Sequence, residues 1–198
     1  FMKKWISLVA LITQIYFAQC DIEAAKNYQQ ELVTHYTDEK NSPLKGELFT
    51  NFEGLLFYPI SDKYCVTATF KRTKKEKPFP MKTTSSRTPM YVKYGEISFE
   101  IDGKKLKLDV FQNLDLIKMN PKYKNSLFLP FTDLTSGVTS YGGGRYLDLE
   151  IPKKRKFTLD FNKAYNPYCA YAPGYSCPLT PKQNDLEVEV LAGVKYNN

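Results

Sequence analysis

The chain has 198 residues, of which 42% are hydrophobic and 25% charged, and it carries a formal charge of +7 at neutral pH. This length fits one domain, and the composition excludes a disordered or collagen-like chain because it supplies enough apolar residues for a core. Aromatic residues make up 15% of the chain. Aromatic side chains suit half-buried strands, so the composition favours a mainly β fold.

Residues 1–20 have the layout of an export signal. Two lysines precede an apolar run over residues 5–17, and a polar stretch begins after Cys20. The run is too short for a permanent membrane helix and is typical of a signal peptide. Cleavage after Ala18 and a lipoprotein cut that leaves Cys20 acylated both stay open. Either route predicts an exported protein, in the periplasm or at the outer membrane, attached to a membrane only through a lipid on Cys20.

After the signal, the sequence predicts one helix followed by strands. Apolar residues recur at helical spacing from Asp21 to Glu39, and a proline soon after stops the pattern. We therefore expect a helix and its connector over residues 21–45. His35, the only histidine, is expected on the surface of that helix. Residues 46–198 contain no linker and no repeat, and are predicted to form one mainly β domain.

Short strand-like runs with turn signals between them fill this second part. They cover residues 49–58, 64–70, 90–92, 97–101, 106–111, 127–131, 146–151, 157–161 and 186–191. Asp102-Gly103 is a strong hairpin signal, and residues 71–87 form a polar loop. The order of elements predicts a single antiparallel β-sandwich or barrel-like domain with one N-terminal helix.

The four cysteines are Cys20, Cys65, Cys169 and Cys177. In an oxidising compartment Cys169 and Cys177 are the natural disulfide pair, because a Pro-Gly pair between them folds the loop back. Cys65 lies in a strand pattern and is expected to be a buried thiol. A zinc site is the weaker interpretation, since structural zinc takes four ligands. No metal and no cofactor is predicted.

Two basic runs, residues 71–77 and 153–156, could suggest an anionic partner. Both lie where strands are connected, and aromatic residues do not interleave with the lysines. They are therefore interpreted as solvated loops, and no nucleic-acid partner is expected.

The first candidate binding motif is the stretch from Tyr141 to Asp148, which reads YGGGRYLD. Its three glycines permit sharp turns, and their backbone N–H groups could form an anion-binding nest. Arg145 adds a planar cation that suits a carboxylate or phosphate. The alternative is a tight bend before a strand, with Arg145 paired to Asp133, Asp148 or Asp160. No helix pattern and no Gly-Lys-Ser/Thr follows, so this is not a nucleotide P-loop.

The second candidate motif runs from Asp160 to Cys177 and contains Asn162 and Asn166 among tyrosines. These amides either bond to local turn backbone or contact a ligand in a polar, ring-lined pocket. The predicted ligand-binding residues are Tyr141, Gly142, Gly143, Gly144, Arg145, Tyr146, Asn162, Tyr165 and Asn166. Asp133 and Asp148 are the catalytic candidates, because paired carboxylates support acid–base chemistry without histidine. A serine hydrolase is not expected, since the only histidine lies on another segment.

Several blocks of the sequence match a known family pattern. They are Gly54–Pro59, Tyr94–Phe99, Asp133–Gly137, Tyr141–Asp148, Asp160–Pro167, Cys169–Tyr171 and Tyr175–Pro178. In these blocks the chain resembles the bacterial family called domain of unknown function 1684, from about Ser42 to the C-terminus. The resemblance implies that the C-terminal blocks belong to one unit, and it implies no activity, substrate or cofactor. Where many relatives have Gly-Glu-Lys, this chain has Gly193-Val194-Lys195.

Three functions agree with these observations. The first is binding of a small polar or anionic ligand at the two motifs. The second is a carboxylate-dependent enzyme of hydrolase type, with Asp133 or Asp148 as acid or base. The third is a structural or interaction domain of the cell envelope, in which the motifs only build the fold.

Overall fold

The computed structural model describes residues 20–196, so the predicted signal lies outside the described residues except for Cys20. Its helices are α1 (Ile22–Thr37), α2 (Glu47–Thr50) and α3 (Leu114–Met119). Its strands are β1 (Cys65–Arg72), β2 (Phe79–Pro80), β3 (Met90–Ile101), β4 (Lys104–Asn113), β5 (Ser126–Phe131), β6 (Arg145–Glu150) and β7 (Lys156–Asp160). Short 3-10 helices are η1 (Asp62–Tyr64), η2 (Pro121–Asn125), η3 (Phe161–Lys163), η4 (Tyr168–Ala170) and η5 (Lys182–Asn184).

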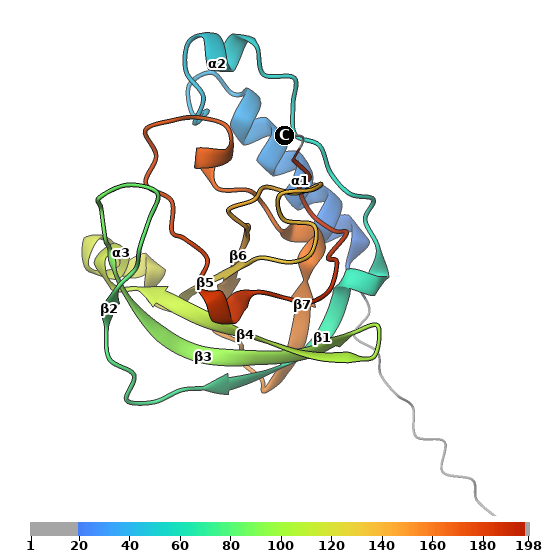
Figure 1. Cartoon of the computed structure of the whole chain (residues 1–198), viewed down its shortest axis with the longest axis vertical. Coiled ribbons are helices and arrows are strands. Elements are labelled where there is room, and N and C mark those ends of the chain that lie inside the picture. Colours follow the sequence, from blue (N-terminus) through green and yellow to red (C-terminus); the bar gives the residue numbers. More distant parts are fainter. Residues whose placement is uncertain (1–19, 197–198) are drawn as a thin grey trace, which may run out of the picture.

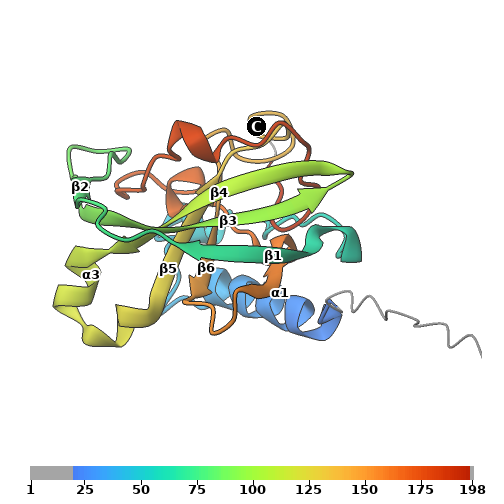
Figure 2. The same ribbon diagram turned by 90° about the horizontal axis from the view of Figure 1, so that it is seen from below.

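The strands form one antiparallel sheet of seven strands, which curls into a half-barrel (Figure 1). Strands β6, β5, β4, β3, β1 and β7 lie side by side in that order, and β2 pairs with β3. The mainly β, barrel-like prediction is therefore confirmed, with the curl left open between β6 and β7. Helix α1 packs beside η3, the turn that follows β7, and lies below β1 in Figure 2.

The principal core lies on one face of this sheet. Alternate strand residues such as Ile97, Leu108 and Leu129 are fully buried there, as the period of two in a strand requires. The segment from Leu186 to Ala192 packs against them and belongs to the same hydrophobic cluster. A smaller cluster joins α1 to the C-terminal region, with Tyr36 at its centre.

Local signals predicted several elements well. Helix α1 begins after Asp21, whose side chain caps it by accepting from the Ala24 N–H at 2.9 Å. The hairpin between β3 and β4 turns at Asp102 and Gly103, both with positive φ. The two runs predicted at residues 90–92 and 97–101 are one strand, with a bulge next to Gly95. A Cβ at Gly95 would lie 2.5 Å from the Phe70 ring, so only glycine fits there.

Other predictions were wrong. Residues 49–58 form no strand beyond a single bridge from Phe57 to Val194, because α2 and the chain around it pack against α1 instead. Strand β2 lies within the predicted polar loop, and α3 lies where no helix was predicted. Residues 186–191 also form no strand, although Leu186, Val188 and Val190 alternate into the core as expected. Two backbone hydrogen bonds join that segment to residues 132–134, and side chains supply the bonds of its later part.

Candidate functional site

A buried ion pair anchors the C-terminal segment to the sheet. Arg145, the first residue of β6, and Asp133 both have fully buried side chains, and their Nη2 and Oδ2 atoms lie 3.1 Å apart. Arg145 also donates to the backbone carbonyls of Val190, at 2.8 Å, and of Ala192. The Val190 N–H in turn donates to Asp133 at 2.6 Å. The pair thus supplies the hydrogen bonds that a neighbouring strand would give residues 190–192.

The environment of Arg145 is closed to ligands. Burial lowers the pKa of its guanidinium, and the charge of Asp133 opposes that shift. Thr135 and Ser136 also donate to the Asp133 carboxylate. Of the two roles that the sequence left open for Arg145, the geometry favours the paired, structural one. Asp133 and Asp148 are not brought together, because Asp133 belongs to this buried pair.

The glycine loop before β6 serves the same close packing. Gly144 has a φ of 91°, and a Cβ on it would lie 2.6 Å from the Phe131 carbonyl oxygen. Its N–H donates to the Tyr141 carbonyl at 3.0 Å, so this donor closes a turn. Gly142 and Gly143 are exposed. The loop brings Arg145 to the core, which explains why the motif combines glycines with an arginine.

The two predicted asparagines are also interior. Asn162 is fully buried, and its amide exchanges hydrogen bonds of 3.0 Å with the backbone N–H and carbonyl of Ser61. Asn166 donates to the Tyr171 hydroxyl at 2.8 Å and to the Lys195 carbonyl at 3.2 Å. Its Oδ1 is buried without a hydrogen-bond partner among residues 20–196. Both amides tie distant segments together.

Tyr146, Tyr165 and Asp148 meet in a cleft on the other face of β5 and β6. Because side chains alternate along β6, Arg145 and Leu147 point into the core while Tyr146 and Asp148 point away from it. Phe128 of β5 is the direct partner of Asp148 in the sheet. Tyr165 joins them because its backbone exchanges two hydrogen bonds with Tyr146, of 2.8 and 3.0 Å.

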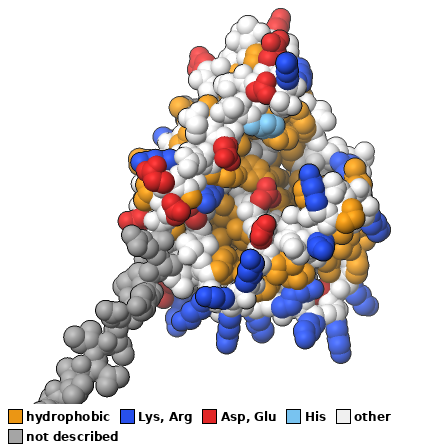
Figure 3. All heavy atoms as spheres, turned by 180° about the vertical axis from the view of Figure 1, so that it is seen from behind, with side chains coloured by type: hydrophobic (Ala, Val, Ile, Leu, Met, Phe, Trp, Pro, Cys, Tyr) orange, Lys and Arg blue, Asp and Glu red, His pale blue; other side chains and the backbone are white. Residues whose placement is uncertain are grey.

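We call this region the tyrosine cleft. Its residues are Tyr91, Phe128, Tyr146, Asp148, Tyr165 and Tyr168. It consists of two hollows of about 260 and 170 Å³, which share Tyr91 and Phe128 as a common wall. The rings contact one another edge to face, with 4.7 Å between the centres of Phe128 and Tyr146 and 5.8 Å between those of Tyr146 and Tyr165. Figure 3 shows a hollowed face on which hydrophobic side chains surround acidic ones.

Asp148 is the charged centre of the tyrosine cleft. The Tyr165 hydroxyl donates to its Oδ2 at 2.7 Å. Water reaches the open side of the Asp148 side chain, yet the surrounding protein desolvates the carboxyl group and raises its pKa above the ordinary aspartate value. The hydrogen bond from Tyr165 opposes that rise. Burial, and then the negative charge of Asp148, raise the pKa of Tyr165 well above its ordinary value.

Helix α1 and η4 border the tyrosine cleft. His35 Nε2 lies 3.0 Å from the Tyr168 hydroxyl, so the histidine predicted on the helix surface contacts the rim of the cleft. Burial, and then the charge of Asp148, raise the pKa of Tyr28 on α1, which places Tyr28 within electrostatic reach of that carboxyl group. Cys169 and Cys177 form the predicted disulfide, and Cys177 lines the cleft.

Three of the six cleft residues, Tyr146, Asp148 and Tyr165, are among the predicted site residues, and Tyr168 lies in the predicted Asp160–Cys177 motif. Tyr91 and Phe128 were not predicted, and His35 was expected only on the surface of its helix. Their contribution depends on strand register and on helix packing, and no local motif signals either. Phe128 could have been found only by placing β5 opposite β6 in the observed register.

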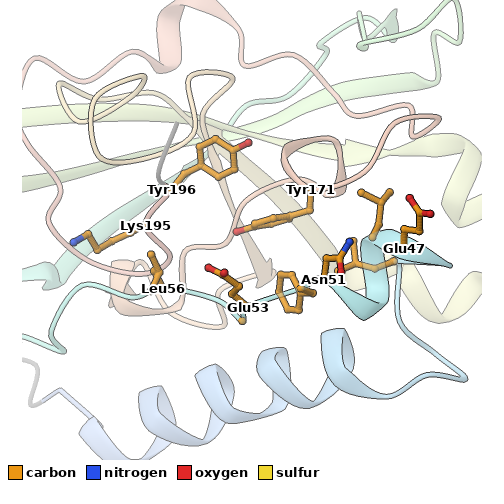
Figure 4. A pocket seen from close by; sticks show the side chains of 11 residues that line it. Glu47, Asn51, Glu53, Leu56, Tyr171, Lys195 and Tyr196 are labelled. Atoms are coloured by element: carbon orange, nitrogen blue, oxygen red, sulfur yellow. The ribbon is translucent and has the colours of Figure 1, made fainter.

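A second hollow, of about 580 Å³, lies between α2 and the C-terminal segment (Figure 4). Tyr171, Tyr196 and the charged Glu47, Glu53 and Lys195 line it. The predicted Tyr141 reaches it only indirectly, because its ring packs on Tyr196 with 5.3 Å between centres. Glu47, Glu53 and Lys195 share this hollow without an ion pair between them, and Asp148 likewise forms no ion pair within residues 20–196.

Comparisons with other proteins agree with the resemblance seen in the sequence. A family model described as "Protein of unknown function (DUF1684)" matches residues 50–195. An uncharacterized protein of Haloarcula marismortui, solved by solution NMR, is 34% identical and has a TM-score of 0.67. That match covers 87% of this chain and 92% of the archaeal one. A comparison with curated proteins finds no match. No helix within residues 20–196 has the length and apolar character needed to cross a membrane.

Proposed function

Because the chain belongs to the DUF1684 family, which is described only as being of unknown function, we propose a function from its own geometry. The protein binds a small ring-bearing ligand, neutral or positively charged, in the tyrosine cleft. It does so as an exported protein. The observation that carries the proposal is Asp148, a carboxyl group that lies open to water between aromatic rings and whose nearest bonded partner is the Tyr165 hydroxyl.

The chemistry of the cleft selects the class of ligand. Aromatic walls supply flat apolar surface that stacks on a planar or ring-shaped ligand, and their electron-rich faces attract cations. Asp148 accepts hydrogen bonds when ionised, so it favours ligand groups that donate them. A perturbed carboxyl group in a mainly apolar hollow is also a general mark of a binding or catalytic site.

The support for an anionic ligand is weaker. The expectation of an anion depended on Arg145 and on the glycine backbone beside it. Arg145 is fully buried and bonded to Asp133 and to two carbonyl groups, and the Gly144 N–H closes a turn. An anion in the tyrosine cleft would face Asp148, which has no ion-pair partner among residues 20–196, and like charges repel at this range.

Three probes that share one phenol ring test the proposal. Tyramine carries a positive charge, 4-hydroxybenzyl alcohol is neutral, and 4-hydroxyphenylacetate is negative. Binding is measured by chemical-shift changes of the labelled protein. We expect tyramine and the alcohol to bind and to shift signals of Tyr91, Tyr146 and Tyr165, while the carboxylate binds weakest.

Two variants distinguish ligand binding in the tyrosine cleft from ligand binding in the second hollow. Asp148→Asn keeps the shape of the cleft and removes its charge, so the preference for tyramine over the carboxylate should disappear. Glu53→Gln is the matched control, because it removes a carboxylate from the second hollow and should leave all three affinities unchanged. Equal binding of cation and anion to the wild type, or shifts confined to the second hollow, would contradict the proposal.

An enzyme with Asp148 as general acid is the second candidate. Its raised pKa lets Asp148 hold a proton at higher pH than an ordinary aspartate. Asp148 shares a further hollow of about 260 Å³ with Glu150, Asp160 and Lys163, so two more carboxyl groups lie at the same opening. The pair considered from the sequence, Asp133 with Asp148, does not support this mechanism. Turnover of a ring-bearing substrate that is lost in both Asp148→Asn and Asp160→Asn would favour the enzyme.

A further inference from the structure

We propose that Cys20 and Cys65 form a second disulfide, which ties the start of the folded chain to β1. Neither residue is bonded in the structure described above. The sulfur atoms of both cysteines and a carboxylate oxygen of Asp160 all lie within 4.8 Å of one another. This inference is independent of the ligand proposed for the tyrosine cleft.

The topology explains why two cysteines distant in sequence meet. Cys65 begins β1 and is the direct partner of Asp160, the last residue of β7. The chain then turns through η3, on which α1 packs, and Gln29 of α1 donates to the Asn162 carbonyl at 2.9 Å. Cys20 lies two residues before α1 begins, so the same packing brings its side chain to Cys65.

The surroundings stabilise neither thiol as a thiolate, because burial raises the pKa of both cysteines. Burial, and then the hydrogen bond with Cys20, raise the pKa of the Cys65 thiol, so it stays protonated at neutral pH. Cys20 is partly exposed and can be reached from solvent. In an exported protein such a pair meets disulfide oxidants, and the Cys169–Cys177 bond is the precedent within this chain.

The reaction balances as thiol–disulfide exchange. The Cys20 sulfur attacks an external disulfide, such as oxidised glutathione, and one thiol leaves. The Cys65 thiol then gives up its proton as its sulfur attacks the mixed disulfide at Cys20, which forms the S–S bond and releases the second thiol, which takes up a proton. The protein loses two protons and two electrons, and the external disulfide takes up both.

The bond would decide between the two cleavage routes predicted from the sequence. A lipid attached through the Cys20 sulfur and a disulfide at the same sulfur exclude each other. A metal is the other use of this cluster, but it offers three ligands where structural zinc takes four. Asp160 Oδ1 is also engaged, because it accepts from the Asn162 side chain at 2.8 Å.

Peptide mapping tests the proposal. The protein is exported with its own leader, purified, equilibrated with oxidised glutathione, unfolded in iodoacetamide without reduction, and digested with trypsin. We expect the peptide of residues 64–71 to be cross-linked to the peptide that ends at Lys26, and released by reduction. The peptide of residues 164–182, which contains both Cys169 and Cys177, is the internal control for a bonded pair.

The variant Cys65→Ser completes the experiment. It should abolish the cross-link and leave Cys20 alkylated or bound to glutathione, with the control peptide unchanged. In the wild type, a 64–71 peptide that is alkylated or carries glutathione would overturn the proposal. A lipid mass on Cys20, or zinc bound at one ion per chain and lost in Cys65→Ser, would overturn it as well.

Discussion

Arg145→Ala should destabilise the fold severely, because it leaves a buried carboxylate without its cation. Removing one partner of a buried ion pair costs about 3–5 kcal/mol. Arg145 and Asp133 are both fully buried, so water cannot replace the lost partner. The carbonyls of Val190 and Ala192 lose their donor in the same variant. These losses overlap, and we expect a total of at least about 3 kcal/mol, or more than a hundredfold in the folding equilibrium.

Urea unfolding followed by circular dichroism measures this loss. The midpoint should fall while the slope with urea stays that of the wild type. Arg145→Lys should recover only part of the stability, since an ammonium group cannot reach three acceptors with the geometry of a guanidinium. Lys63→Ala is the control, because Lys63 and Asp102 form an ion pair on the surface and its loss should not move the midpoint measurably.

A double-mutant cycle with Asp133→Ala isolates the pair itself. Each single variant leaves one buried charge unpaired, so the double variant should lose less stability than the two single losses together. The reasoning is refuted if Arg145→Ala unfolds at the wild-type midpoint. That result would favour the other role that the sequence left open for Arg145, which is ligand binding.

Four further predictions concern the cleft, the glycine loop and the disulfide. Folding raises the pKa of Asp148, so the stability of the wild type should fall as pH rises from the ordinary aspartate pKa through the folded value. Urea titrations of Asp148→Asn should not show this fall. An equal fall in both proteins would contradict the prediction. Tyr165→Phe should raise the pKa of Asp148 further, because the hydrogen bond from the Tyr165 hydroxyl lowers that pKa. Carbon-13 NMR of the Asp148 carboxyl group measures the pKa, and an unchanged value would show that the hydrogen bond is absent. Gly144→Ala should cost more than about 1 kcal/mol, since its backbone has a positive φ and its Cβ would meet a carbonyl oxygen; wild-type stability would refute the clash. Reducing Cys169–Cys177 should cost about 2–3 kcal/mol in the same unfolding assay, with Cys169→Ser as the matched variant, and an unchanged midpoint would contradict this stabilisation.

Local signals in the sequence predict the parts of the fold that local chemistry determines. Asp21 caps α1, and Asp102 turns the hairpin, because each acts within a few residues of its own position. The alternation from Leu186 to Val190 correctly predicts which side chains are buried. No strand ladder forms, because the hydrogen bonds of Val190 and Ala192 go to the side chains of Arg145 and Asp133.

The candidate site could be predicted only in part for the same reason. Tyr146 and Asp148 share a face through strand periodicity, which the sequence contains. Phe128 joins them through sheet register, and His35 reaches the cleft rim through the packing of α1 against η4. These contacts join residues far apart along the chain, and no pattern within one segment encodes them. The role of Arg145 was open in the sequence because a buried partner and a ligand carboxylate suit a guanidinium equally well.

Native mass spectrometry of the protein purified from its own cells tests the central claim most directly. We expect a non-covalent ligand that contains a ring and is neutral or cationic, and that is lost in Asp148→Asn and in the rim variant Tyr168→Ala while Glu53→Gln retains it. An anionic ligand, or a wild-type protein that carries no ligand, would contradict binding in the tyrosine cleft.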